Sequence, residues 1–176
     1  MNIKGVNSLP RRGGFTLIEL VVVIVVVSTL VGVAIDKLLY YQERAEKAVL
    51  DETLESVKMG LRIRMAELIV SNRTSELPQL ERENPMQWLS EPPASYAGVD
   101  TAAKPGNWFY ATKEKELAYV PKSSSYLEGG QISGQRDKTE LRFKVELRYQ
   151  APTEGGGRAI VGITLVPTRA YKWFQM

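Results

Sequence analysis

The residues of this sequence with the clearest chemical potential lie near its N-terminus, where two arginines and two glycines precede a long apolar segment. Residues 15–35 contain one ionisable side chain, Glu19. A charged side chain at the centre of a membrane-spanning helix costs on the order of 2.5–3.5 kcal/mol on insertion scales. A plain anchor gains nothing from such a residue, whereas a segment that later docks against copies of itself can offset the cost with a partner charge. Glu19 is therefore the first candidate functional residue, with a role between subunits.

The apolar segment has the length of a membrane span. As a helix, residues 15–35 would extend about 32 Å at ~1.5 Å per residue, which matches a hydrocarbon core of about 30 Å. Lys4, Arg11 and Arg12 precede the segment, and only Lys37 follows it closely, beside Asp36. The positive-inside rule therefore predicts a cytoplasmic N-terminus, with residues 36–176 on the other side of the membrane.

Two simpler interpretations of this segment remain open from the residues alone. A secretory signal peptide would have its small-residue cleavage site at Gly32-Val33-Ala34, but a charge at the head of its apolar stretch is atypical, and the stretch is long. A single-pass anchor accounts for the length and the flanking charges. Neither interpretation gives Glu19 a purpose.

A motif at the start of the apolar segment favours a third interpretation. Gly14-Phe15-Thr16-Leu17-Ile18-Glu19, preceded by basic residues, resembles the processing site of type IV prepilins and type II secretion pseudopilins. The resemblance implies that a prepilin peptidase cuts between Gly14 and Phe15 and methylates Phe15. It also implies that Glu19, the fifth residue of the mature chain, meets the N-terminal amine of a neighbouring pilin subunit.

The same resemblance implies an organisation for the whole chain. Residues 1–14 would be a cleaved cytoplasmic leader, residues 15–35 a transmembrane and assembly helix, and residues 36–176 a periplasmic globular pilin-like domain. The protein would sit in the inner membrane before it joins a pilus or pseudopilus filament. Its partners would be the peptidase and other pilins, which it contacts through the N-terminal helix.

Elementary electrostatics supports the role that the resemblance gives to Glu19. After cleavage, the amine of Phe15 and the carboxylate of Glu19 lie one helical turn apart. The positive end of the helix dipole favours an acid in the first turn. A contact between this carboxylate and the amine of a neighbour would replace two uncompensated charges by one pair, so that association relieves a burial cost.

The helix is expected to continue well beyond the membrane. Apolar residues recur at steps of three and four as far as Ile69, with charged residues between them, and no proline occurs between Pro10 and Pro78. The spacing predicts one helix over residues 15–70, apolar all round in its first half and amphipathic in its second. Glu43 and Lys47 are spaced for an i,i+4 ion pair in the favourable order.

The remaining sequence predicts a sheet for the amphipathic half to cover. Residues 71–107 read as a loop that holds a short helix at 84–89, with Asn84 as N-cap and Trp88 pinned to the core. Strands are expected at residues 107–112, 116–120, 141–149 and 159–166, and strict alternation points Leu141, Phe143, Val145, Leu147 and Tyr149 to one side. The expected fold class is α+β: a long N-terminal helix packed on a roughly four-stranded antiparallel sheet, as in pilins.

A looser similarity covers the middle of the chain. The elements Asn84-Pro85-x-x-Trp88-Leu89, Pro92-Pro93-x-x-Tyr96-x-Gly98, Trp108-Phe109-Tyr110 and Leu117-x-Tyr119 are similar to minor pilin-like proteins of mannose-sensitive haemagglutinin-type pili. The chain has no cysteine, whereas many major pilins staple a C-terminal loop with a cysteine pair. The resemblance therefore favours a minor pilin or pseudopilin, with an adhesin or DNA-capture subunit as the alternative.

Composition argues against an enzyme. The chain has no histidine and no cysteine, which excludes His-based acid–base catalysis, thiol chemistry and His or Cys metal ligands. No cofactor is expected. No metal site is expected either, since the acids and serines at 121–140 lack the alternation of a calcium loop: Ser123, Ser124, Ser125, Glu128, Asp137 and Glu140.

Charge gives no reason to expect nucleic acid as a partner. Of the 23 basic residues, Lys4, Arg11 and Arg12 precede Phe15, where no acid occurs, so the mature chain would carry 20 basic and 20 acidic residues. The basic stripe Arg142, Lys144 and Arg148 is interrupted by Glu146 and is interpreted as a solvated sheet face.

Overall fold

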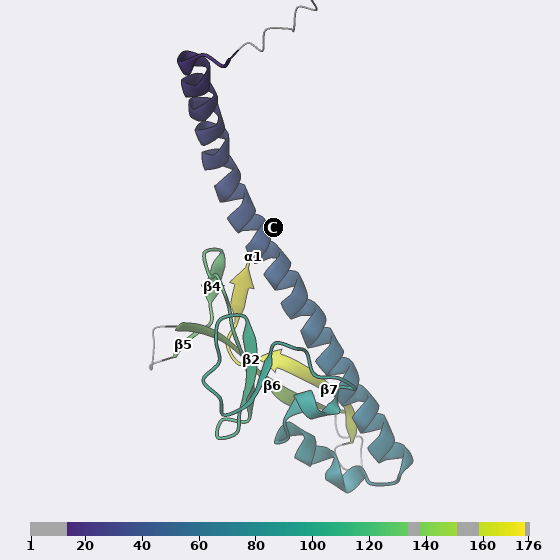
Figure 1. Ribbon diagram of the computed structural model, residues 1–176. Helices are drawn as coiled ribbons and strands as arrows, with labels where there is room; N and C mark the ends of the chain where they lie inside the picture. Colours follow the sequence, from purple (N-terminus) through teal and green to yellow (C-terminus); the bar gives the residue numbers. More distant parts are fainter. Residues whose placement is uncertain (1–13, 134–137, 151–158, 175–176) are drawn as a thin grey trace, which may run out of the picture. The chain divides into compact units, whose positions relative to one another are not determined.

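The computed structural model describes residues 14–133, 138–150 and 159–174. The chain divides into two compact units, Met1–Tyr40 and Tyr41–Met176, here called unit 1 and unit 2. Helix α1, Leu17–Val70, runs through both (Figure 1). The expectation of one helix over residues 15–70 is confirmed to within two residues at its start.

Capping residues in the local sequence explain where α1 begins and ends. At the start, the Glu19 backbone N–H donates to Thr16 Oγ1 at 3.3 Å, so Thr16 acts as the N-cap residue. At the end, Asn72 adopts a left-handed conformation with φ 56°, and the Arg73 N–H donates to the Leu68 carbonyl at 2.8 Å. This arrangement is a Schellman C-cap, which satisfies carbonyl groups that the last turn leaves without partners.

In unit 2, the sheet is larger than the sequence predicted. Its centre is the expected antiparallel set of β2 (Asn107–Ala111), β3 (Glu116–Val120), β6 (Lys138–Tyr149) and β7 (Ile160–Pro167). Two short strands extend it: β1 (Tyr96–Val99) pairs parallel with β2, and β5 (Gln131–Ser133) pairs with β6. A separate ribbon, here called the C-terminal ribbon, joins β4 (Leu127–Gly129) to β8 (Tyr171–Trp173). The α+β class is confirmed.

One face of the second half of α1 is buried against this sheet. Its buried apolar residues follow steps of three and four: Leu50, Leu54, Val57, Leu61, Met65 and Leu68. From the sheet, Leu141, Phe143, Val145 and Leu147 are buried in the same cluster, as their alternation predicted. Tyr149 departs from that prediction and is 49% exposed; it is the last residue of β6, where the β6–β7 register shifts.

The connection between α1 and the sheet contains two short 3-10 helices, η1 (Thr74–Glu81) and η2 (Pro85–Trp88). The predicted cap is present: Asn84 Oδ1 accepts a hydrogen bond from the Met86 N–H at 3.1 Å. Trp88 packs on the core, and the Arg64 guanidinium lies 4.4 Å from its ring centroid. Gly60 lets α1 approach η2, because a Cβ at this position would lie 2.7 Å from the Trp88 carbonyl oxygen.

Arg142 corrects the interpretation of the basic stripe as a solvated face. Lys144 and Arg148 are exposed, but Arg142 is half-buried between two carboxylates. Its guanidinium pairs with Glu140 at 2.8 Å and with Glu116 at 3.3 Å. Thr168 donates a further hydrogen bond to Glu116 at 3.0 Å. The side chains thus join β3, β6 and the residue after β7, which is a structural role.

Candidate processing and assembly segment

Gly14 and Phe15 precede α1 and lie open to their surroundings. Gly14 is exposed, and a Cβ built on it would meet no atom within 4 Å. Phe15 is 78% exposed. An exposed bond outside regular structure is what a peptidase needs. The basic residues Lys4, Arg11 and Arg12 lie outside the described residues.

Glu19 occupies the third position of the first helical turn. Because Thr16 caps the helix, the pair forms the Thr-x-x-Glu spacing of a capping box. The Glu19 side chain is exposed. Within residues 14–133, 138–150 and 159–174, its carboxylate has no hydrogen-bond or ion-pair partner. A partner for it must come from outside the described chain.

The part of α1 in unit 1 is apolar on all sides. Its large apolar residues from Leu17 to Leu39 are between 45% and 80% exposed. The helix is long and apolar enough to cross a membrane, and no part of its most apolar window is buried. A helix without a polar face packs against lipid or other apolar helices. Glu19, the single acid of residues 15–35, therefore has a specific partner or carries a cost.

The ion pair predicted from the sequence for a second helix carboxylate, Glu43, is wrong. This carboxylate does not pair with Lys47, which instead contacts Asp51 at 2.6 Å. Glu43 is buried, at 2% exposure, and accepts three hydrogen bonds. The donors are Ser123 Oγ at 2.6 Å, the Tyr126 N–H at 2.9 Å and Trp173 Nε1 at 2.9 Å.

These bonds keep the buried carboxyl group ionised. Burial raises the pKa of Glu43, but the hydrogen bonds from Ser123, Tyr126 and Trp173 outweigh it, so that its pKa lies below the ordinary value. Each donor comes from a segment far along the chain, and no spacing in the sequence marks the pairing. The one hint in the sequence is Trp173, since the N–H group of a buried tryptophan usually needs a hydrogen-bond acceptor.

Glu46, one turn further on, makes a similar connection. Its Oε1 accepts hydrogen bonds from the Tyr119 hydroxyl and from the Lys122 N–H, both at 2.7 Å. Burial, followed by the bond to Glu46, raises the pKa of Tyr119, so this phenol stays neutral. Glu43 and Glu46 together fasten the segment after β3 and the C-terminal ribbon to α1.

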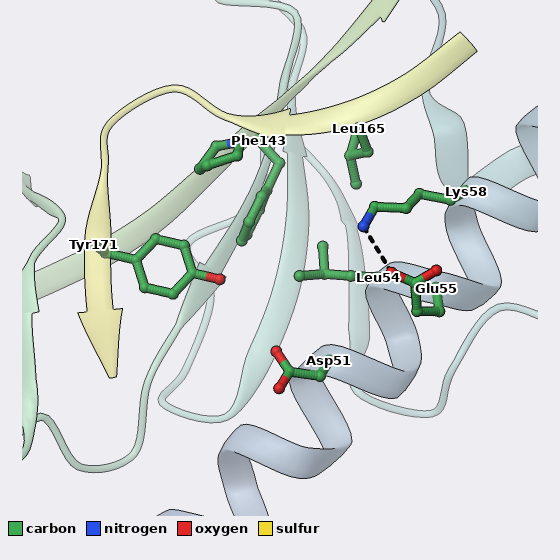
Figure 2. A pocket seen from close by; sticks show the side chains of 8 residues that line it. Asp51, Leu54, Glu55, Lys58, Phe143, Leu165 and Tyr171 are labelled. Atoms are coloured by element: carbon green, nitrogen blue, oxygen red, sulfur yellow. Dashed lines mark hydrogen bonds and ion pairs between the residues drawn. The ribbon is translucent and has the colours of Figure 1, made fainter. Parts of the chain in front are cut away.

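Unit 2 has a hollow of about 220 Å³ between α1 and the sheet. Figure 2 shows the side chains that line it. Leu54, Phe143 and Leu165 supply apolar walls, and Glu55 at its rim pairs with Lys58 at 2.7 Å. Tyr171 points into it, and burial together with the nearby Asp51 charge raises the pKa of Tyr171 to about 12. The Tyr171 phenol is therefore not poised for acid–base work near neutral pH.

Metal binding finds no support in the described part of the chain. Residues 14–133, 138–150 and 159–174 contain no group of three or more His, Cys, Asp or Glu side chains that could hold an ion. Of the acids considered for a calcium loop, Glu140 pairs with Arg142, while Asp137 lies outside the described residues.

Comparison with known proteins places a family signal on the same segment. Residues 9–35 match the family described as the prokaryotic N-terminal methylation motif. Comparisons of the chain with curated proteins and with solved structures gave no match. The match, with the exposed apolar helix behind it, supports a similarity of this N-terminal segment to type IV pilin-like proteins.

Proposed function

We propose that this chain is a minor pilin or pseudopilin, a structural subunit of a type IV pilus or a type II secretion-like filament. One observation is the main support for this proposal. The methylation-motif match at residues 9–35 covers a helix whose apolar surface is exposed on all sides and holds one unpaired acid, Glu19. Neither a signal peptide nor a plain anchor uses that acid.

In this proposal, prepilin peptidase hydrolyses the bond between Gly14 and Phe15, and the new amine of Phe15 is methylated. Gly14 suits the position because it stands free of side-chain contacts outside the helix. Removal of residues 1–14 also removes the excess of basic side chains and leaves the mature chain formally neutral. The apolar helix then keeps the protein in the inner membrane.

Assembly depends on the charged N-terminal amine that cleavage creates. The amine of Phe15 in one subunit meets the Glu19 carboxylate of its neighbour, inside a layer of apolar helices. In a medium of low dielectric constant, removal of one partner leaves the other buried and unpaired, which costs more than the loss of both. This asymmetry selects subunits that carry both groups.

The topology completes the proposal. The leader is cytoplasmic, residues 15–35 cross the inner membrane, and residues 36–176 form the periplasmic pilin-like domain. The absence of cysteine favours a minor pilin or pseudopilin over a major pilin, because a disulfide staple stabilises a loop by about 2–4 kcal/mol in long-lived fibres. The mannose-sensitive haemagglutinin-type pilus is the first system to test.

A glycine pair tests the processing site in cells that contain the filament machinery. Gly14→Val should block conversion to the shorter form and remove the protein from the filament fraction, because a branched side chain obstructs the residue before the cut. Gly32→Ala is the matched control, since its Cβ also meets no atom within 4 Å. Conversion of Gly14→Val at the wild-type rate would contradict the assignment of Gly14.

A further inference from the structure

We propose that the open edge of strand β7 in unit 2 is a docking site for an extended acidic segment of another protein. The segment lies beside β7 as an added strand, and its carboxylates pair with Arg62 and Arg148. All residues of this site belong to unit 2, so the inference does not depend on the proposed processing or membrane insertion of residues 15–35.

Strand β7 lies at an edge of the sheet. Among the described strands it pairs with β6 alone. Just beyond its end, the Thr168 N–H donates to the Arg142 carbonyl at 2.8 Å. Because hydrogen-bonded pairs alternate along an antiparallel ladder, the even-numbered residues from Gly162 to Val166 bond to β6. The backbone N–H and C=O groups of Ile163 and Leu165 therefore face the other way, toward the open edge.

Two neighbouring features agree with this assignment. Leu147, the register partner of Ile163, directs its N–H away from β7 and donates to the Glu81 carboxylate at 2.8 Å. Pro167 is the last residue of β7 and has an odd number, so its missing N–H would have faced the open edge, where a sheet tolerates proline. An edge with unpaired backbone groups is a template for pairing with another chain.

A hollow of about 410 Å³ near this edge is lined by residues of α1, β6 and β7. Binding clefts commonly have volumes of about 300–1,000 Å³. Met65 and Ile163 supply buried apolar walls, and Tyr149 and Val161, which are 49% and 56% exposed, add accessible apolar surface. Side chains of an added strand would therefore have apolar surface to cover.

The charged residues in the lining of the hollow are two exposed arginines, Arg62 on α1 and Arg148 on β6. Among the described residues, neither guanidinium has a hydrogen-bond or ion-pair partner. The Glu55 carboxylate, which senses the Arg62 charge, is already paired with Lys58 at 2.7 Å. Both arginines can therefore accept carboxylates from another molecule as partners.

Gly162 gives Arg148 a path to the open edge. The two residues are register partners, and a Cβ on Gly162 would lie 3.7 Å and 3.8 Å from the Cβ and Cδ of Arg148. The arginine stem thus passes over the glycine, through space that a longer side chain on β7 would fill. Glycine inside a strand often marks a place where another backbone approaches closely.

The two arginines belong to opposite faces of the sheet. Arg148 alternates with the buried Leu147 and lies on the outer face, whereas Arg62 belongs to the helix that covers the inner face. Successive side chains of a strand point to opposite faces. Neighbouring carboxylates of an added strand would therefore pair with one arginine each.

A second copy of the chain fits this edge poorly. Pairing of two β7 strands would bring two copies of Arg62 and Arg148 together, and no carboxylate among the described lining residues would balance them. Like charges on facing strands are destabilising. A nucleic acid would satisfy the arginines, but it has no peptide backbone with which to complete the ladder of β7.

A peptide array tests the proposal with the full-length protein in detergent. The probes are synthetic hexapeptides of alternating valine and threonine in which two positions are replaced by glutamate in every combination, with lysine and unsubstituted peptides as controls. Peptides with neighbouring glutamates should bind roughly tenfold or more tightly than their lysine counterparts, which meet like charges. Absence of binding up to about 1 mM, or equal binding of acidic and unsubstituted peptides, would overturn the proposal.

Backbone methylation of the best peptide tests the strand pairing. N-methyl groups on one alternate set of residues should abolish binding, and those on the other set should be tolerated, because only alternate N–H groups of an added strand face β7. Equal loss from both sets, or loss from neither, would contradict strand pairing. A deoxythymidylate dodecamer that competes with the peptide at equal affinity would reassign the edge to a polyanion and overturn the proposal.

Arginine variants test the charge pairing. Arg62→Gln and Arg148→Gln should each weaken binding of the acidic peptide by roughly two- to fivefold, as expected of solvent-exposed ion pairs, and leave the unsubstituted peptide unaffected. Arg169→Gln, an exposed arginine outside the hollow, is the matched control. Thermal unfolding verifies the fold of each variant. A folded double variant that binds the acidic peptide at the wild-type affinity would overturn the role of the arginines.

A nitroxide label on Val161→Cys reports what occupies the edge, since the chain has no cysteine of its own. The label should lose mobility when the acidic peptide is added and should keep it with the lysine peptide. Dipolar broadening between labels on two chains, unchanged by the acidic peptide, would assign the edge to a second copy and overturn the proposal.

Discussion

At the scale of single residues, the chain uses two helix carboxylates in opposite ways. Glu19 is exposed and has no partner in the described part of the chain, whereas Glu43 is buried among three donors. The Glu19 carboxylate can still accept a hydrogen bond or an ion pair from another molecule, whereas the Glu43 carboxylate makes its hydrogen bonds within unit 2. Substitutions at the two positions should therefore separate assembly from folding.

Replacement of Glu19 should affect assembly and leave processing intact. Glu19→Ala removes the partner of a neighbour's amine, and we expect the amount of protein in the filament fraction to fall by roughly tenfold or more, since ~1.4 kcal/mol corresponds to a factor of ten. The readout is the ratio of filament to membrane protein by immunoblot. Glu52→Ala, an exposed acid of the same helix, is the control. A Glu19→Ala protein that enters filaments at the wild-type level refutes the role of this acid.

Replacement of Glu43 should affect the stability of unit 2. Glu43→Ala leaves donors from Ser123, Tyr126 and Trp173 without their acceptor. Buried unsatisfied groups cost about 1–3 kcal/mol each, so we expect a loss of roughly 3 kcal/mol or more. Urea unfolding in detergent, followed by tryptophan fluorescence, measures it. Glu52→Ala should change the unfolding free energy by less than about 0.5 kcal/mol. Equal stability of the two variants would show that the buried bonds contribute nothing.

The Glu43 site also predicts a pH dependence. Because its folded-state pKa lies below the ordinary 4.5, ionised Glu43 stabilises unit 2 above that value. The contribution is lost as the pH falls through the folded-state pKa. The unfolding free energy of the wild type should therefore drop more steeply below pH 4.5 than that of Glu43→Gln, which cannot titrate. Parallel pH profiles would contradict an ionised buried carboxylate.

At the scale of elements, periodicity allowed much of the fold to be predicted. Steps of three and four marked α1, and alternation at residues 141–147 marked the inward face of β6. The short strands β1, β4, β5 and β8 were not predicted, because three or four residues are too few to show an alternation of apolar and polar side chains. The role of Glu43 escaped for another reason: its partners lie 80 or more residues away, so no local pattern records them.

Gly60 shows how an element can depend on a missing side chain. In an exposed helix, Ala is about 1 kcal/mol more favourable than Gly. Here the Cβ would lie 2.7 Å from the Trp88 carbonyl oxygen, a backbone atom that cannot move cheaply. We expect Gly60→Ala to destabilise unit 2 by about 1–3 kcal/mol, as overpacking does. Gly162→Ala is the control, since its Cβ contacts begin at an ordinary 3.7 Å. A neutral or stabilising Gly60→Ala would refute the close approach.

At the scale of the whole molecule, the two units differ in what they present to their surroundings. Unit 1 presents an apolar helix that needs lipid or other helices, and unit 2 supplies a folded α+β domain with its own core. In the proposed function, removal of residues 1–14 leaves 20 basic and 20 acidic residues, so self-association would meet no net charge repulsion. The proposal then requires one change of surroundings, from bilayer to filament, in which unit 2 keeps its fold.

The mass of the membrane form tests the central claim most directly. Protein purified from cells with an active prepilin peptidase should lack residues 1–14 and begin at Phe15 with one added methyl group on its amine, as fragment spectra of the N-terminal peptide would show. A chain that still begins at Met1, or one cut after Ala34, would contradict the account.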